Sequence, residues 1–205
     1  MSNVILWDYP KSSASYRVRI ALNLAGIDYE IRTVDLLARD HIGPDHMARN
    51  PQGFVPVLDI DGHRLTQSLA ILEYLDATRD IGLLPKEPVA RAQQTALAHA
   101  IAVDLHPVCN LSVVGFATKG KEPQRTEWMQ HFITPRMAAF EAILEGFDQS
   151  PFCCGATPSL ADIVLMPQIY NANRWGADYS DCTRIKKVET ACSAHPAFVA
   201  AHPDR

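Results

Sequence analysis

Three serines near the start of the chain have the type and spacing to stabilise an anion. Ser12, Ser13 and Ser15 stand between a short apolar run and a segment with helical periodicity. The first N–H groups of a helix have no partner within the helix, and with the helix dipole they favour a bound negative charge. A serine hydroxyl that donates to a sulfur would add to this effect and favour thiolate over thiol. The same serines would also serve as ordinary helix caps, so the loop alone does not distinguish an anion-binding site from a capped helix.

Two dipeptides further along could present polar groups to a peptide-like ligand. In Val55–Pro56, the proline lacks the backbone N–H that would donate to a neighbouring strand. A peptide bond before proline is also the kind that readily adopts the cis form. The backbone of Val55 could then pair with a ligand as a strand does; the alternative is an ordinary trans proline at a sheet edge. Gln67–Ser68 offers an amide, a hydroxyl and helix N–H groups to a carboxylate, and taken alone it would be an N-cap.

The elements that must position these groups alternate strand and helix patterns. Strands are predicted over residues 4–8 and 29–34, and an Asp61–Gly62 turn joins a hairpin of residues 55–60 and 63–66. Apolar residues at helical spacing predict helices over 15–25 and 68–78, and the charged stretch 35–50 is expected to hold a short helix. The predicted order is β-α-β-α-β-β-α.

That order is typical of a thioredoxin-type unit, in which a redox Cys-x-x-Cys motif occupies the loop before the first helix. Here Ser12 and Ser15 fill the two cysteine positions, which excludes dithiol exchange at this loop. A unit that keeps the helix end but lacks its own thiol is suited to activating a thiol brought in by a ligand. Glutathione is the obvious candidate.

The rest of the chain predicts helices. A helix is expected from residue 90 until Pro107 interrupts it, followed by a loop over 115–123 and a helix over 125–145. Ser159 and Asp162 have the spacing of a capping box, which would open a buried helix over about 160–172. One more helix is expected over 184–193. We therefore expect an α/β thioredoxin-like N-terminal domain (1–80), a linker (81–88) and an all-α C-terminal helical domain (89–205).

The amino-acid composition argues against nucleic-acid-binding and membrane-spanning proteins. The chain has 205 residues, 47% of them hydrophobic, and a net charge of −4. It therefore has enough apolar residues for a core and lacks the basic excess that nucleic-acid binding requires. We expect no nucleic-acid partner and, without an apolar run of roughly 20 residues, no membrane span. Five cysteines, an odd number, and no secretory pattern predict free thiols in the cytoplasm.

Two other clusters contain residue types that could form a site. His41 and His46 stand among acidic residues, but no further ligands follow at a recognisable metal spacing, so no metal is expected and a mobile charged rim of the active site is predicted instead. The adjacent Cys153 and Cys154 are expected to be core or loop thiols.

Taken together, the sequence resembles the zeta-class glutathione transferase and maleylacetoacetate isomerase family over nearly its whole length. The matching segments are residues 12–22, 26–29, Asn50–Pro51, Val55–Pro56, 67–75, 83–85, His106–Pro107, 110–113, Ala161–Asp162 and Pro167–Gln168. The resemblance implies a homodimer with its active site in the cleft between two domains. It also implies glutathione-dependent cis–trans isomerisation of maleylacetoacetate, an intermediate of tyrosine and homogentisate breakdown.

The resemblance also assigns roles to individual residues. Ser12 would face the glutathione sulfur, with Ser13 and Ser15 completing the thiolate pocket. Val55 would pair with the cysteinyl backbone, and Gln67 and Ser68 would hold the γ-glutamyl carboxylate. The remaining polar residues would reach the ligand or the second substrate; they are His106 and Asn110 for the ligand and Arg174 for the substrate carboxylates. Arg17 would either assist Arg174 or be a surface charge.

The chain departs from the family at two positions. Ala14 stands where animal members usually have cysteine, and Lys11 stands where an arginine is common. Lysine keeps the charge but loses the two-pronged contact with a carboxylate. Maleylpyruvate isomerisation and conjugation of glutathione to α-halo acids or other small electrophiles therefore stay open as alternatives. A non-catalytic glutathione-fold binding protein is the alternative of another class.

Overall fold

The chain forms two compact units in a computed structural model that describes residues 4–205. The first comprises residues 4–81 together with Pro196–Arg205, and the second comprises Gly82–His195. Residues 196–205 thus belong to the first unit, whereas the sequence led us to expect a helical domain up to residue 205. They do so because the short helix α9 (Pro196–Ala200) packs on α1 (Ser13–Leu24) and buries Phe198.

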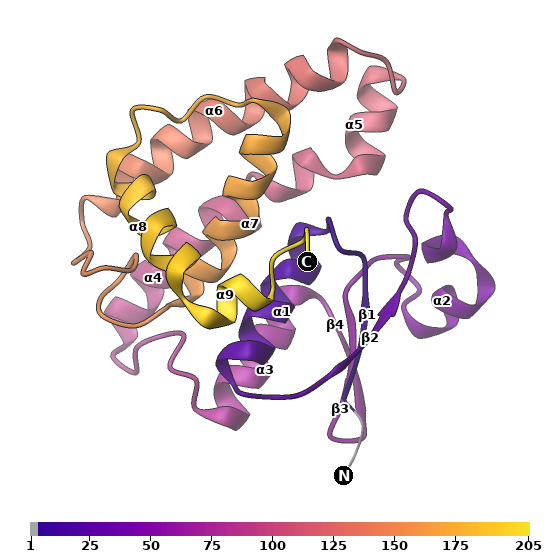
Figure 1. Cartoon of the computed structure of the whole chain (residues 1–205), viewed down its shortest axis with the longest axis horizontal. Helices are drawn as coiled ribbons and strands as arrows, with labels where there is room; N and C mark the ends of the chain where they lie inside the picture. The colour runs from indigo at the N-terminus through magenta and orange to yellow at the C-terminus, as the bar shows by residue number, and fades with distance from the viewer. Residues whose placement is uncertain (1–3) are drawn as a thin grey trace. The chain divides into compact units, whose positions relative to one another are not determined.

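The first unit is built on a mixed sheet with the strand order β2-β1-β3-β4 (Figure 1). Its strands are β1 (Ile5–Asp8), β2 (Glu30–Thr33), β3 (Val57–Ile60) and β4 (His63–Thr66). β1 pairs in parallel with β2 and antiparallel with β3, and β3 and β4 form the predicted antiparallel hairpin. Asp61 and Gly62 both have positive φ angles there, 53° and 78°, as a two-residue hairpin turn of type I′ requires. The thioredoxin-like fold class is confirmed.

Helices cover the sheet of the first unit. α1 packs against α3 (Ser68–Arg79), and Figure 1 shows both on one side of the sheet with α2 (Pro44–Arg49) on the other. The stretch expected to hold one short helix contains α2 and the 3₁₀ turn η1 (Asp40–Ile42). Apolar side chains of α1, α3 and the central strands are almost fully buried between them. Their burial provides the main driving force for this unit.

The strand register brings three predicted site segments to one end of the sheet. Trp7 pairs with Val57, and Val57 pairs with Thr66. The loop after β1, the Val55–Pro56 bond before β3 and Gln67–Ser68 after β4 therefore leave the sheet at the same end, because neighbouring antiparallel strands run in opposite directions.

The second unit consists of helices packed around α7 (Leu160–Trp175). Its other elements are α4 (Pro88–Ala102), η2 (His106–Cys109), α5 (Leu111–Thr118), α6 (Gln124–Leu144) and α8 (Thr183–Ala194). α7 packs against α4, α6 and α8, and most of its residues are buried, as predicted.

Two boundaries differ from the sequence-based expectation. α4 ends at Ala102, before Pro107, and Pro107 lies in the first turn of η2, where a missing N–H is tolerated. α5 continues to Thr118, through the start of the predicted loop, and ends where Lys119 and Gly120 adopt positive φ. Within residues 4–205, no single helix is long and apolar enough to cross a membrane; only the bent pair Pro88–Cys109 and Leu111–Thr118 meets that criterion jointly.

Candidate active site

Ser12 is the N-cap of α1. Its backbone is extended, with φ −75° and ψ 120°, and its hydroxyl oxygen accepts from the Ser15 N–H at 3.3 Å. The Ser12 N–H donates to the Tyr9 carbonyl at 2.9 Å, which closes a turn immediately before the helix. The capping role is therefore confirmed. A hydroxyl that accepts still holds its own proton, so Ser12 can cap α1 and donate to a ligand sulfur at once.

A buried cation lies one turn further along the same helix. Arg17 is only 2% exposed, so it is not a surface charge, and its Nη1 donates to the Ser68 hydroxyl at 3.3 Å. Burial lowers its pKa from 12.5 to about 10. Among residues 4–205, neither its Nε nor the hydroxyl of the fully buried Ser15 has a hydrogen-bond partner. Buried polar groups without partners are rare in proteins, and these two suit an anionic ligand.

The Val55–Pro56 bond is cis, the first of the two forms considered from the sequence. The preceding carbonyl, that of Phe54, contacts His46 Nε2 at 2.9 Å and accepts from the Asn50 side chain at 2.9 Å. His46 is 2% exposed, so the expectation of a mobile charged rim is wrong for this residue. His46 and Asn50 fix the loop that leads to Val55, a role that sequence spacing did not reveal.

Gln67 and Ser68 stand at the start of α3, and the backbone of Gln67 has an unusual conformation. Gln67 has φ 68°, in a region that residues other than glycine seldom occupy. Its Nε2 donates to Gln52 Oε1 at 2.7 Å, which joins the loop before Val55 to the start of α3. Such backbone outliers cluster at ligand-binding sites. The sequence does not predict this role for Gln52, because its partner Gln67 is fifteen residues away and no local motif connects the two.

Three predicted residues belong to the helical unit. His106 begins η2, and Asn110 is at the N-cap position of α5 without making a capping bond. Arg174 is exposed near the end of α7, and its guanidinium lies 5.5 Å from the centroid of the Trp175 ring. A cation held by an aromatic face remains able to meet a carboxylate. The roles of these residues stay predictions.

The chain's own thiols are poor nucleophiles. All five cysteines are free, and burial raises the pKa of each of them. The pKa of Cys109 rises to about 12 and that of Cys154 to about 11. Because thiolate is the reactive form, a thiolate at neutral pH would have to come from a ligand.

Comparison with known proteins agrees with this geometry. Residues 2–77 match the family model of the glutathione S-transferase N-terminal domain. A maleylacetoacetate isomerase of Rhizobium meliloti (strain 1021) is 53% identical over 100% of this chain and 98% of its own length.

Solved structures agree as well. A maleylacetoacetate isomerase from Anaeromyxobacter dehalogenans 2CP-1, crystallised with glutathione in its active site, is 39% identical and covers 99% of this chain and 96% of its own, with a TM-score of 0.89. A bacterial maleylpyruvate isomerase, described as a zeta-class glutathione S-transferase, is 35% identical, with 97% and 96% coverage and a TM-score of 0.91. The chain belongs to the zeta-class glutathione transferase family that includes the maleylacetoacetate isomerases.

Proposed function

We propose that this protein is a glutathione-dependent isomerase that converts maleylacetoacetate to fumarylacetoacetate. The observation that carries the proposal is the Ser12 hydroxyl at the N-terminus of α1, at the same sheet end as a buried cation that contacts Ser68. The full-length similarity to maleylacetoacetate isomerases supports the choice of substrate. From the family we also infer a homodimer, a cytoplasmic location and a place in aromatic amino-acid breakdown.

Glutathione binds to the first unit in this proposal. Ser12 donates to the sulfur, and the free N–H groups at the start of α1 stabilise the thiolate, with Ser13 and Ser15 lining the pocket. Val55 pairs through its backbone with the cysteinyl residue. Gln67, Ser68 and the α3 N-terminus hold the γ-glutamyl carboxylate. His106 and Asn110 reach the ligand from the helical unit.

The isomerisation then needs no net consumption of glutathione. The thiolate adds to the cis double bond of the conjugated dioxo acid, and the electrons move onto the carbonyl as an enolate. The former double bond, now single, rotates. Collapse of the enolate expels the thiolate and leaves the trans product. Arg174 binds a substrate carboxylate, because guanidinium groups suit both anion binding and stabilisation of developing negative charge.

A direct assay separates this function from its alternatives. Isomerisation of maleylacetoacetate is expected to depend strictly on glutathione and to be at least as fast as turnover of maleylpyruvate or dichloroacetate. The similarity to a maleylpyruvate isomerase makes that compound the principal competitor. Activity on only one of the other two substrates would move the assignment there. Glutathione binding without a lowered thiol pKa, and without turnover, would favour a binding protein.

The buried Arg17 gives an independent test of glutathione binding. Because burial lowers the pKa of Arg17 to about 10, the folded protein disfavours the charge at neutral pH, and this penalty lessens only as pH rises above about 10. Arg17→Met is therefore expected to leave the melting temperature of the ligand-free protein unchanged or higher. It should also reduce the increase in melting temperature that glutathione causes, because Arg17 contacts Ser68, which holds the γ-glutamyl carboxylate in the proposed complex.

Thermal melts with and without glutathione measure both effects. Arg64→Met is the matched control, since Arg64 is an exposed arginine of the same unit that pairs with Asp59. It should keep the full glutathione-induced increase. An equal increase in the Arg17→Met protein would remove Arg17 from the glutathione site.

A further inference from the structure

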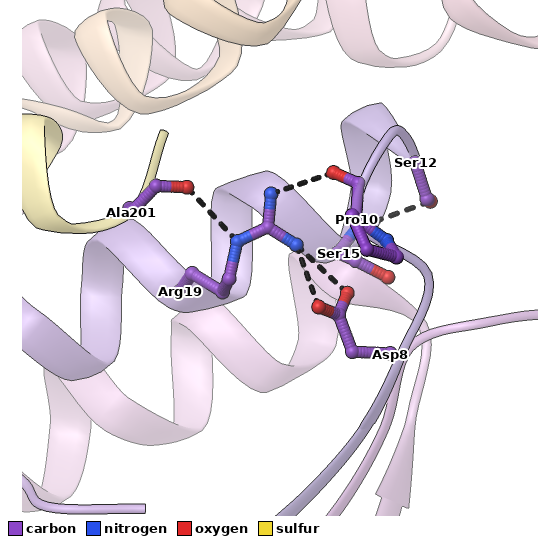
Figure 2. A network of polar contacts seen from close by, with 6 residues as sticks. All are labelled: Asp8, Pro10, Ser12, Ser15, Arg19 and Ala201. Atoms are coloured by element: carbon purple, nitrogen blue, oxygen red, sulfur yellow. Dashed lines mark hydrogen bonds and ion pairs between the residues drawn. The ribbon is translucent and has the colours of Figure 1, made fainter. Parts of the chain in front are cut away.

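A second buried arginine on α1 joins three separate parts of the first unit (Figure 2). Arg19 Nη1 donates to both carboxylate oxygens of Asp8 at 2.8 Å, and Nη2 donates to the Pro10 carbonyl at 2.9 Å. Its Nε donates to the Ala201 carbonyl at 2.9 Å. Arg19 is 4% exposed and Asp8 1% exposed, so solvent hardly weakens these bonds.

The acceptors of Arg19 flank the loop that carries Ser12. Asp8 is the last residue of β1, and Pro10 is two residues before Ser12. Two backbone bonds hold Ser12 itself, since its N–H donates to the Tyr9 carbonyl and its carbonyl accepts from the Tyr16 N–H of α1, both at 2.9 Å. The bond from Arg19 to Pro10 adds a side-chain restraint between α1 and the residues that lead into Ser12, because Arg19 belongs to the helix that Ser12 caps.

Residues 196–205 complete the arrangement. Tyr16, Arg19 and Asn23 share one face of α1 by their spacing, and all three contact this segment. The Asn23 side chain donates to the Ala197 carbonyl at 2.9 Å, and the rings of Tyr16 and His202 meet edge to face at 6.1 Å between centroids. Arg19 also bonds to the Pro10 carbonyl, in the loop before Ser12.

We propose that Arg19 is a positioning residue, which with Asp8 and the Ala201 carbonyl fixes the direction in which Ser12 presents its hydroxyl to the bound sulfur. This inference rests on the proposed use of glutathione. A buried ion pair contributes little net stability, so stability alone gives weak reason for one here. The strength of a hydrogen bond to a thiolate depends steeply on its angle. A restraint on the direction of the Ser12 hydroxyl would therefore favour the thiolate. The planar, forked guanidinium can reach three acceptors at once, whereas a lysine ammonium cannot hold the same geometry.

Arg19→Lys tests the proposal, because lysine keeps the positive charge opposite Asp8 but lacks the planar guanidinium that reaches three acceptors at once. The pKa of the bound glutathione thiol is read from thiolate absorbance as the pH is raised. We expect that pKa to rise by roughly half a unit to one unit, with kcat at neutral pH falling about 3- to 10-fold and the KM for glutathione changing less than about 2-fold. Two tyrosines also lie near the pair: the Tyr16 ring centroid is 5.3 Å from the Arg19 guanidinium, and burial raises the pKa of Tyr29 above its usual 10.0.

Asn23→Ala is the matched control. It removes a bond from the same face of α1 to the same segment but leaves the Pro10 loop untouched. It should lower the melting temperature without moving the thiol pKa. Equal pKa shifts in the two variants would overturn the proposal, as would an unchanged pKa in Arg19→Lys.

A double variant shows whether Arg19 acts through Ser12. If it does, adding Arg19→Lys to Ser12→Ala should raise the thiol pKa no further than Ser12→Ala alone, whereas independent effects would add and contradict the proposal. If Arg19→Lys does not fold, Asp8→Asn replaces it and is expected to shift the pKa in the same direction. Absence of glutathione binding to the unmodified protein would instead overturn the proposed function.

Discussion

Replacing Ser12 by alanine is expected to lower kcat for the glutathione-dependent isomerisation by roughly 10- to 100-fold, because a hydrogen bond to a charged group contributes about 1.5–3 kcal/mol. Glutathione affinity should change little, since the backbone of Val55 and the Gln67–Ser68 region hold the rest of the tripeptide in the proposed complex. The thiol pKa of bound glutathione should rise. Steady-state kinetics and thiolate absorbance across pH measure the two effects, and an unchanged rate would remove Ser12 from the catalytic role.

The capping function of Ser12 must be separated from its proposed catalytic role. Loss of an N-cap destabilises a helix by about 1 kcal/mol, so Ser12→Ala changes stability as well. Ser12→Thr keeps both the cap and the donor. Ser12→Asp keeps the cap but places an anion without a donor beside the sulfur. We therefore expect Ser12→Thr to retain most activity and Ser12→Asp to be stable and nearly inactive; equal losses in Ser12→Ala and Ser12→Thr would contradict the hydrogen-bond explanation.

Removal of the Asp162 carboxylate is expected to cause the largest loss of stability. Asp162 is fully buried at the start of α7 and accepts from the Cys153 N–H, the Ser159 N–H and the Ser159 hydroxyl, at 2.8, 2.8 and 2.6 Å. Asp162→Ala leaves these buried donors without a partner, and each such donor costs about 1–3 kcal/mol. We expect the free energy of unfolding to fall by roughly 3–5 kcal/mol, as for other broken buried charge networks. Urea denaturation measures this.

The pH dependence of stability provides a check on the same residue. Burial is the main cause that raises the pKa of Asp162 above its usual 3.8. The folded state therefore binds this proton more tightly than the unfolded state, and stability falls as pH rises from 3.8 towards the raised pKa. Asp162→Asn should abolish that dependence and destabilise less than Asp162→Ala, because one accepting oxygen remains.

Asp178→Ala is the control for Asp162→Ala. Asp178 is exposed and accepts from the Ser180 N–H at 2.8 Å in the same helical unit. It should change the free energy of unfolding by less than about 0.5 kcal/mol. A similar value for Asp162→Ala would show that the buried network contributes no special stability.

The features predicted well from sequence depend on residues close together in the chain. The Asp61–Gly62 turn, the Ser12 cap and the Ser159–Asp162 box are each specified within about four residues, and all three occur in the structure. Local backbone preferences decide such features before any tertiary contact forms. The thioredoxin-like order of elements could be predicted for the same reason.

The features that sequence reasoning missed depend on distant partners. Arg19 and its acceptor Ala201 are 182 residues apart, so the helical periodicity of residues 15–25 could not reveal what covers Arg19. Likewise, nothing in the stretch around His46 indicates that its ring reaches the Phe54 carbonyl from a buried position. Catalytic roles in the helical unit, such as that of Arg174, likewise stay predictions because they require contacts with a substrate.

The first unit consists of two segments that lie far apart in the chain, so the ribosome makes them at different times. Residues 4–81 leave the ribosome long before residues 196–205, which belong to the same unit. At about 5–20 residues per second, the interval between residues 81 and 201 is roughly 6–24 seconds. During that time the face of α1 formed by Tyr16, Arg19 and Asn23 lacks its covering segment. The synthesis of the first unit thus begins before that of the helical unit and is completed after it.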